Sequence, residues 1–187
     1  MEPSASDERE LIRLARQHDE AAFAALVEAY AARLYRIARR MLPDEMEAEA
    51  VVQETFWRFW QALPRYDDEG PLLPYLATIA SNLARDRFRR ERRLEDLPAE
   101  EAQGEPQAAQ EREVESQVED RHTLERLAVY VQGLPPAYRT VIALRYDADM
   151  SYEQIATVLS LPVNTVRTHL RRAKELLRAQ LEARDDG

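Results

Sequence analysis

The sequence predicts an all-α protein made of two small helical domains joined by a flexible acidic linker. The 187-residue chain has only 4 Gly but 45% hydrophobic residues, a composition that favours helices packed around cores over disorder. Apolar residues recur at helical spacing in both halves of the chain. Between these halves, residues 95–120 are acidic and almost without large apolar side chains. We therefore expect domains at residues 1–94 and 121–187.

The acidic segment accounts for the net charge of the whole chain. Residues 95–120 hold ten acids against Arg112 alone, whereas the rest of the chain is neutral, with 25 basic and 25 acidic side chains. A segment of this composition cannot bury enough apolar surface to fold alone. It is either a soluble spacer, an acidic strand that lies in a basic channel of a larger partner, or a shield for arginine-rich faces when DNA is absent.

The apolar pattern of the N-terminal domain predicts three or four helices. Pro43 and Pro64 each end one of them, because proline disfavours helical geometry in the residue before it. Gly70-Pro71 indicates a turn before the last of these helices. The expected helices span residues 7–17, 20–42, 44–63 and 74–93.

Residues 151–178 predict a helix-turn-helix. Ser151 and Gln154 fit a capping box at the start of a short helix, and Pro162 suits the first turn of the next one. The second helix is apolar on one side and polar or basic on the other, which is typical of a recognition helix in the major groove. The alternative is an ordinary solvated amphipathic helix. The candidate DNA-contacting residues are Asn164, Thr165, Arg167, Thr168, Arg171 and Arg172.

A second basic patch lies at the end of the fourth helix. Arg85, Arg89 and Arg90 belong to a run of arginines that would neutralise phosphates and release counterions. Tyr66 and Tyr75 precede this run and could stack on unpaired bases, although packing in the core or at its rim is the other interpretation.

The third helix carries polar residues beside its apolar ones. Gln53 and Glu54 are either solvated surface or part of a docking face for a partner helix. Trp57 projects to a different side from the apolar stripe, so it is a candidate interface residue.

Composition argues against several classes of function. The chain has no Cys, its three histidines are far apart in sequence, and no apolar run approaches the thickness of a bilayer. The one tight carboxylate cluster, Asp67-Asp68-Glu69, lacks a partner histidine, and no Gly-rich phosphate loop is present. We therefore expect a soluble cytoplasmic protein that is not an enzyme and uses neither metal nor cofactor.

Four stretches together resemble the extracytoplasmic-function (ECF) sigma factors of bacterial RNA polymerase. They are AEAVVQETFWRFW, PYLATIASNLARDRFRR, LPPAYRTVIALRY and SYEQIATVLSLPVNTVRTHLRRAKELL, and they occur in the order and at the spacing of that family. The resemblance implies that residues 1–94 form region 2, which binds core polymerase and melts the −10 element. It implies that residues 121–187 form region 4, which recognises the −35 element and reaches the flap region of the polymerase.

The resemblance also assigns roles to single residues. Gln53 and Glu54, with Trp57 beside them, would contact the clamp helices of the largest polymerase subunit. Asn82 would line the pocket for a flipped −10 base, together with the loop from Tyr66 to Pro74. Arg85, Arg89 and Arg90 would hold the backbone there. The linker would thread the positively charged cleft and exit channel of the polymerase.

This sequence departs from the family pattern at five positions. The family usually has Asp at Ala50, Phe at Leu72 and Trp at Tyr75, so one polar clamp contact and one aromatic ring are missing while the ring at Tyr75 is kept. In region 4, Asn164 replaces a usual Gly and His169 a usual Arg, and these changes affect the −35 contacts.

Two hypotheses follow for the function. In the first, the chain is a sigma factor whose partners are core RNA polymerase, promoter DNA and an anti-sigma factor, with no membrane insertion. In the second, it is a stand-alone helix-turn-helix regulator with a helical sensor or dimerisation domain. The pairing of AEAVVQETF with the aromatic loop and the arginine run favours the first, because a sensor domain needs neither.

Overall fold

The computed structural model describes residues 3–67, 70–95 and 129–185. The predicted linker at 95–120 lies outside the described residues, apart from Glu95, and so do residues 121–128 and the pair Asp68-Glu69. Every regular element within the described ranges is helical, as the sequence predicts. None of the helices in these ranges is long and apolar enough to cross a membrane.

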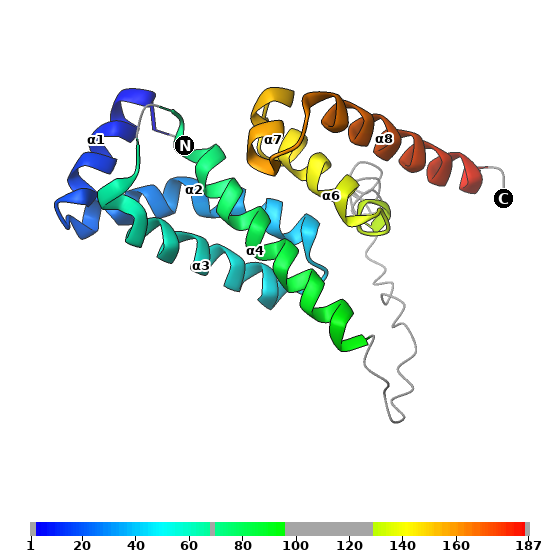
Figure 1. Cartoon of the computed structure of the whole chain (residues 1–187), viewed down its shortest axis with the longest axis horizontal. Helices are drawn as coiled ribbons and strands as arrows, with labels where there is room; N and C mark the ends of the chain where they lie inside the picture. The colour runs from blue at the N-terminus through cyan, green and yellow to red at the C-terminus, as the bar shows by residue number, and fades with distance from the viewer. Residues whose placement is uncertain (1–2, 68–69, 96–128, 186–187) are drawn as a thin grey trace, which may run out of the picture.

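Four α-helices and a short 3-10 helix form the N-terminal domain (Figure 1). Three of the α-helices begin at a polar residue, Ser4, Asp19 or Asp44, whose side chain accepts a hydrogen bond from a backbone N–H of the first turn. The proline-containing breaks at residues 43 and 64 fall where the sequence predicts them. The elements are α1 (Ala5–Arg16), α2 (Glu20–Met41), α3 (Glu45–Ala62), η1 (Leu63–Arg65) and α4 (Leu72–Glu95).

The core of this domain is built around α2, which packs against α1, α3 and α4. Leu26, Leu34 and Ile37 of α2 are fully buried, and Phe59 of α3 and Leu76 of α4 are buried with them. Burial of each such side chain contributes about 1.5–3 kcal/mol to folding. The apolar stripe that the sequence predicts for residues 20–42 is therefore the central face of the bundle.

Helix α4 begins two residues earlier than the sequence indicates. Pro74 was expected at its start, but the helix begins at Leu72 and Pro74 lies within the first turn. The first-turn N–H groups of a helix have no partner inside the helix, so a proline there removes no helical hydrogen bond. A proline thus locates a helix start only to within one turn.

The C-terminal domain contains three α-helices and a π-helical turn. The capping box is present: the Ser151 hydroxyl accepts from the Gln154 N–H at 3.2 Å, and the Ser151 N–H donates to the Gln154 side-chain oxygen at 2.8 Å. Val166, Leu170 and Ala173 are buried along one side of the last helix, as predicted. The elements are α6 (Pro136–Ile142), η2 (Ala143–Asp147), α7 (Tyr152–Leu159) and α8 (Val163–Asp185).

The turn between α7 and α8 depends on Ser160 rather than on Pro162. Ser160 has a φ of 53°, in the left-handed region that favours glycine. The Leu161 N–H donates to the Ala156 carbonyl at 2.9 Å and the Ser160 N–H donates to the Thr157 carbonyl at 3.2 Å, which is the Schellman pattern of helix ends. Helix α7 ends at Leu159, three residues before Pro162.

The two domains pack against each other, α4 against α7 and α2 against α6 and η2 (Figure 1). Arg40 of α2 forms an ion pair with Asp147, and the Gln132 amide donates to the Arg39 carbonyl at 2.6 Å. The Arg139 guanidinium lies 5.9 Å from the centre of the Phe88 ring. One long side of α4 is thereby covered by the C-terminal domain.

Replacing Ser160 with glycine is expected to stabilise the C-terminal domain by about 0.5–1 kcal/mol, because glycine adopts the left-handed conformation without a Cβ clash. The control is Thr157→Gly, at an exposed position inside α7, which is expected to destabilise by about 1 kcal/mol. Urea unfolding measures both, and equal destabilisation by the two glycines would contradict the role given to Ser160.

Candidate functional site

One side of α4 carries most of the residues predicted to contact DNA near the −10 element. Tyr75, Asn82, Arg85 and Arg89 follow one another at spacings of seven, three and four residues, so they share a stripe about 21 Å long. Asn82 and Arg89 are exposed and the other two are partly exposed. The Arg85 guanidinium donates to the Asn82 side-chain oxygen at 3.4 Å. These four predicted residues therefore lie together on one side of α4.

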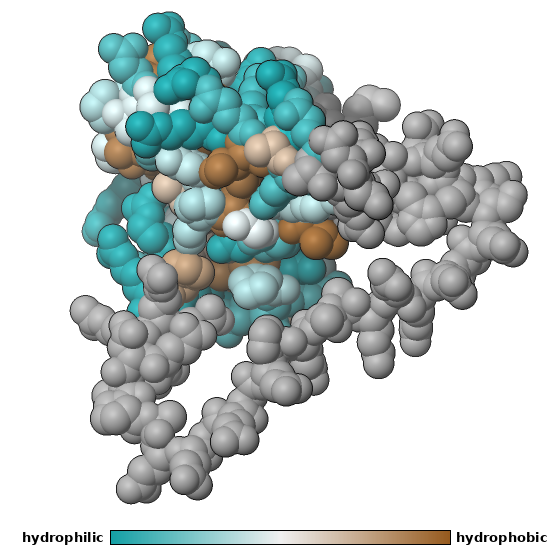
Figure 2. Space-filling model, turned by 90° about the vertical axis from the view of Figure 1, so that its right-hand side faces the viewer, coloured by the Kyte–Doolittle hydropathy of each residue, from teal (hydrophilic) through white to brown (hydrophobic). Residues whose placement is uncertain are grey.

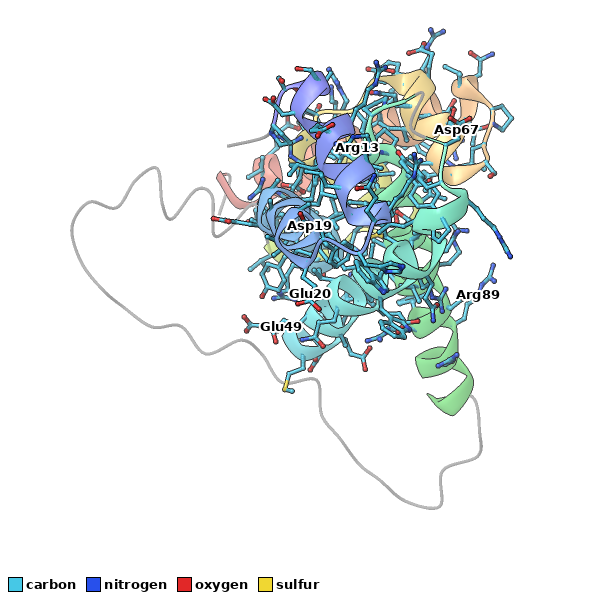
Figure 3. All side chains as sticks on the ribbon, turned by 90° about the vertical axis from the view of Figure 1, so that its left-hand side faces the viewer. Arg13, Asp19, Glu20, Glu49, Asp67 and Arg89 are labelled. Atoms are coloured by element: carbon cyan, nitrogen blue, oxygen red, sulfur yellow. The ribbon has the colours of Figure 1, made fainter. Side chains whose placement is uncertain are left out.

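The arginines of α4 do not all point the same way. Arg89 and Arg90 are exposed, and Figure 3 shows Arg89 directed away from the bundle. Arg87 instead reaches α3, where it pairs with the Glu47 carboxylate and donates to the Glu47 carbonyl at 3.0 Å. It fixes α4 to α3, which leaves Arg85, Arg89 and Arg90 as the outward cations among the predicted residues.

Tyr66 is not at the surface in this structure. Only 9% of it is exposed, and its ring packs on Phe59 at 5.5 Å and on Tyr75 at 4.7 Å between centroids. Phe23 and Trp60 extend the same aromatic cluster, with centroids 4.7 Å apart. Of the two tyrosines, Tyr75 is the more exposed, and the ring of Tyr66 packs against it.

The predicted docking residues of α3 lie on a face turned away from the core. Gln53 is exposed and Trp57 is 58% exposed, whereas Glu54 is partly buried and pairs with Arg58 at 2.8 Å. Met46 belongs to the same face, and at 76% exposed it is the most exposed large apolar side chain among the described residues. Sequence reasoning missed it, although its spacing of seven and eleven residues from Gln53 and Trp57 was a usable signal.

The outer face of α8 presents the predicted −35 residues. Asn164, Arg167 and Arg171 are exposed, and the Thr168 hydroxyl donates to the Asn164 carbonyl at 2.9 Å, which keeps it on the helix. Arg171 pairs with Glu175 at 2.6 Å. Thr165 is partly exposed and Arg172 fully so, on the flank nearer to α6.

Local contacts hold the charges of this face in place. A hydrogen bond to Tyr138 raises the pKa of Arg172 above its ordinary value. Hydrogen bonds from its own backbone N–H and from the Ser151 hydroxyl, together with the positive charge of Arg167, lower the pKa of Glu153. Both shifts favour the charged forms of Arg172 on α8 and Glu153 on α7.

His169 lies off the outer face of α8. It is half-buried, with its ring 5.4 Å from that of Tyr138 on α6, and its Nδ1 atom is buried without a hydrogen-bond partner among the described residues. The departure from the family pattern at this position therefore alters packing between α8 and α6 more than it alters the outer stripe.

The predicted residues thus form three separate surfaces, on α3, α4 and α8, rather than one pocket. Open, polar surfaces with cations and one aromatic face suit nucleic acid and protein partners. Figure 2 shows a face on which hydrophilic residues predominate, with hydrophobic ones gathered near its middle. Within the described ranges, no cluster of His, Asp and Glu side chains could hold a metal ion.

Comparison with known families matches both halves of the chain. The model of Sigma-70 region 2 matches residues 26–94, and that of Sigma-70 region 4 matches residues 124–177. The first match begins in α2 and includes the surfaces of α3 and α4. The second includes α7 and the outer face of α8.

Individual relatives are similar in sequence to this protein over almost its whole length. The ECF RNA polymerase sigma factor SigW of Bacillus subtilis is 35% identical, over 91% of this chain and 94% of its own. The RNA polymerase sigma factor CnrH of Cupriavidus metallidurans is 35% identical over 98% of both chains. The structure of CnrH in complex with the cytosolic domain of CnrY superposes with a TM-score of 0.69 at 31% identity, covering 95% of this chain and 98% of that one.

The two tryptophans are expected to differ in access to solvent. Trp57 is open, whereas Trp60 packs between Phe23 and His18, with centroids at 4.7 and 6.1 Å. Acrylamide should therefore quench the fluorescence of Trp60→Phe, which retains Trp57, more strongly than that of Trp57→Phe. Equal quenching of the two single-tryptophan variants would contradict this arrangement of α3.

Proposed function

The chain belongs to the extracytoplasmic-function sigma factors of bacterial RNA polymerase, and from this premise we propose how its three surfaces divide the work. It directs promoter-specific transcription initiation. The match of both family regions disfavours a stand-alone regulator, for which a polymerase-binding region would have no use. The observation that carries the division of labour is the exposure of a cationic stripe on α4 in one domain and another on α8 in the other.

The stripe on α4 binds the melted −10 element. Extruding a base from the stack costs a few kcal/mol, which a protein offsets by stacking and hydrogen bonds to the base. The partly exposed ring of Tyr75, packed against Tyr66, supplies a stacking surface, and Asn82 supplies an amide within the same stripe. Arg85, Arg89 and Arg90 bind phosphates of the strand.

The outer face of α8 reads the −35 element in the major groove. Arg171 and Asn164 are exposed on it, and side chains of these types form bidentate hydrogen bonds with guanine and adenine edges. Arg167 and Arg172 flank them and contact phosphates, with Thr165 and Thr168 between. The position of His169 against Tyr138 leaves this mode of docking intact.

The outward face of α3 docks on core polymerase. Its exposed apolar residues, Met46 and Trp57, lie on either side of Gln53, and large apolar and aromatic side chains of this kind are typical anchors of protein interfaces. The partly buried Glu54 adds a negative charge beside them. The clamp helices of the largest polymerase subunit are the surface proposed for this contact, and region 4 in turn reaches the flap region.

The domain limits at 1–94 and 121–187, with the acidic linker at 95–120, remain part of the proposal. Two modules that each bind weakly gain affinity when a large partner holds both at the right distance. The positive charge needed by each module is therefore small, and a chain with a formal net charge of −9 can still bind DNA.

An anti-sigma factor is the further partner proposed for this chain. CnrH, which is similar over almost the full length, is known in complex with the cytosolic domain of CnrY. We place the protein in the cytoplasm, where the polymerase acts, and assign it no catalytic step of its own. No cofactor or metal enters this mechanism.

Purified chain is expected to bind core RNA polymerase and to direct run-off transcription from a subset of genomic fragments. Gln53→Lys and Glu54→Lys should weaken binding to core polymerase at least tenfold while leaving the helical content unchanged, because the altered side chains lie outside the bundle core. Glu28→Lys, at an exposed position of α2, is the matched control. Wild-type chain that binds a promoter but ignores core polymerase would overturn the sigma-factor function itself.

Arg171→Ala is expected to weaken holoenzyme binding to −35 duplex DNA by about 1–3 kcal/mol, the range for a side chain that reads a base edge. The comparison is Arg178→Ala, an exposed arginine two turns further along α8. If Arg171 reads a base, its loss also reduces discrimination between the cognate −35 sequence and a mutated one, whereas loss of Arg178 does not. An unchanged ratio for Arg171→Ala would reassign it to the phosphates or to solvent.

A further inference from the structure

Helix α1 lies before the part of the chain that matches region 2, yet it is tied to the segment that leads into the α4 stripe. We propose that Glu8 and Arg16 of α1 are positioning residues that hold, at Leu72 and Tyr66, the two ends of the segment between η1 and α4. In this way they set the place of Tyr75 for the melted −10 strand. The inference rests on the proposed function. It adds to the −10 site two residues that act without contacting DNA themselves.

Arg16 holds the first end of the segment. Its Nε donates to the Leu63 carbonyl at 3.1 Å, and its Nη2 donates to the Tyr66 carbonyl. The planar guanidinium has donors in a fixed fork, so it fixes the two carbonyls relative to each other as well as to α1. Since Leu63 is the C-cap of α3 and Tyr66 follows the η1 turn, the fork fixes the direction in which the chain leaves α3.

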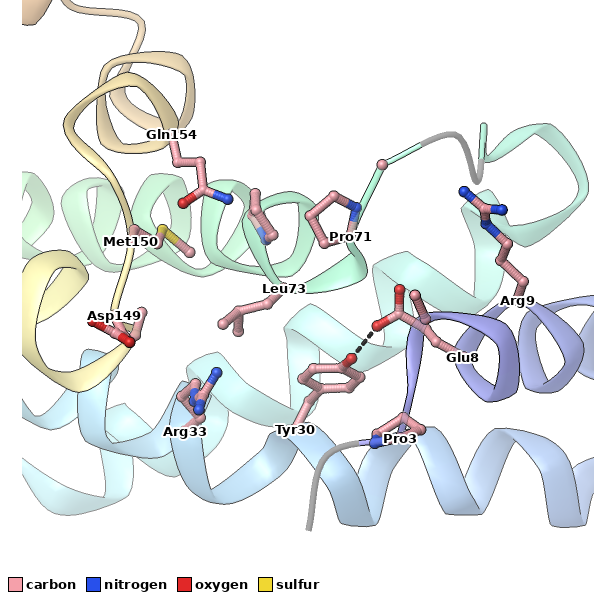
Figure 4. A pocket seen from close by; sticks show the side chains of 14 residues that line it. Pro3, Glu8, Arg9, Tyr30, Arg33, Pro71, Leu73, Asp149, Met150 and Gln154 are labelled. Atoms are coloured by element: carbon pink, nitrogen blue, oxygen red, sulfur yellow. Dashed lines mark hydrogen bonds between the residues drawn. The ribbon is translucent and has the colours of Figure 1, made fainter.

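Glu8 holds the other end. One carboxylate oxygen accepts from the backbone N–H of Leu72, the first residue of α4, at 3.1 Å. The other accepts from the Tyr30 hydroxyl, a contact visible in Figure 4 close to Pro71. A carboxylate at this place satisfies an N–H that has no partner within the helix, and its charge is favoured by the helix dipole.

The contact between Glu8 and the start of α4 is buried inside the domain. Glu8 is only 7% exposed and Tyr30 only 3%. A buried carboxylate is tolerated only where hydrogen bonds replace those it made with water. Glu8 lies at the wall of a cavity of about 440 Å³ that is also lined by Tyr30 and Leu73, so its loss would leave space that nearby side chains do not fill.

Both anchors come from a single rigid helix. Glu8 and Arg16 are eight residues apart, or about 12 Å along α1. Between the two anchored ends, Tyr66 packs on Tyr75 at 4.7 Å, and Tyr75 follows Leu72 by one helical turn. A shift at either anchor therefore moves the same pair of rings. A displacement of about 1 Å in a binding group is enough to lower binding or rate many-fold.

The experiment separates positioning from simple stability by measuring three affinities on full-length chain. They are binding to core polymerase, holoenzyme binding to −35 duplex, and holoenzyme binding to a labelled single strand carrying the −10 element of a promoter that the wild type transcribes. Glu8→Ala and Arg16→Ala should weaken binding to the single strand about tenfold and leave the other two within about twofold of wild type.

Conservative variants give a rescue series. Glu8→Gln retains an oxygen that can accept from the Leu72 N–H, so it should recover most of the affinity for the −10 strand. Arg16→Lys keeps the charge but loses the fork, so it should recover little. Glu10→Gln and Arg13→Lys are the matched controls, because these two residues form an exposed ion pair on the same helix and should leave all three affinities unchanged.

The outcomes distinguish the inference from the proposed function. If Glu8→Ala and Arg16→Ala lose all three affinities in parallel, or if their binding to the −10 strand stays within twofold of wild type, the positioning role is wrong. If Glu8→Ala does not fold, Arg16→Ala and Arg16→Lys decide by the same criterion. If wild type itself binds neither core polymerase nor the −35 duplex, the proposed function fails instead.

Discussion

The packing of α4 is the constraint on which the recognition surfaces depend. This helix contacts α2 and α3 on one side and α7 of the other domain on another, so its residues from Leu72 to Ala84 are largely buried. Among residues 72–90 of α4, the stripe that remains open carries Tyr75, Asn82 and the outward arginines. A helix held from two sides cannot rotate about its axis, because any rotation would expose Leu76 or bury Arg89. The core thus fixes which residues are offered to DNA.

Placement of charge, rather than net charge, explains how an acidic chain can bind a polyanion. The excess of acids is confined to residues 95–120, while the stripes on α4 and α8 are cationic. Two other arginines pair with carboxylates inside the protein: Arg87 with Glu47, and Arg40 with Asp147 across the domain boundary. Such pairing removes competing positive surface. At physiological salt, charges further apart than about 8 Å are largely screened, so the charges within each stripe matter more than the net charge of the chain.

Sequence patterns predict those features that depend on near neighbours in the chain. The bounds of α2, the capping box at Ser151 and the buried stripe of α8 follow from residues a few positions apart, and the structure confirms each. The burial of Tyr66 and the turn of His169 toward Tyr138 arise from contacts between different helices, which periodicity does not encode. The left-handed conformation of Ser160 could not be predicted from the sequence for another reason. Glycine is the usual residue there, so a serine gives no signal.

The contacts of α1 involve residues that are distant in sequence from the proposed −10 site and that no family motif identifies. Arg16 reaches carbonyls 47 and 50 residues away, and Glu8 reaches an N–H 64 residues away. Backbone groups at the ends of a loop belong to every sequence alike, so no motif marks which side chain will satisfy them. Yet their satisfaction is obligatory once they are buried, and the side chain that provides it also determines where the loop begins and ends. The two ends of the segment between η1 and α4 are thus held by residues that carry no recognition chemistry themselves.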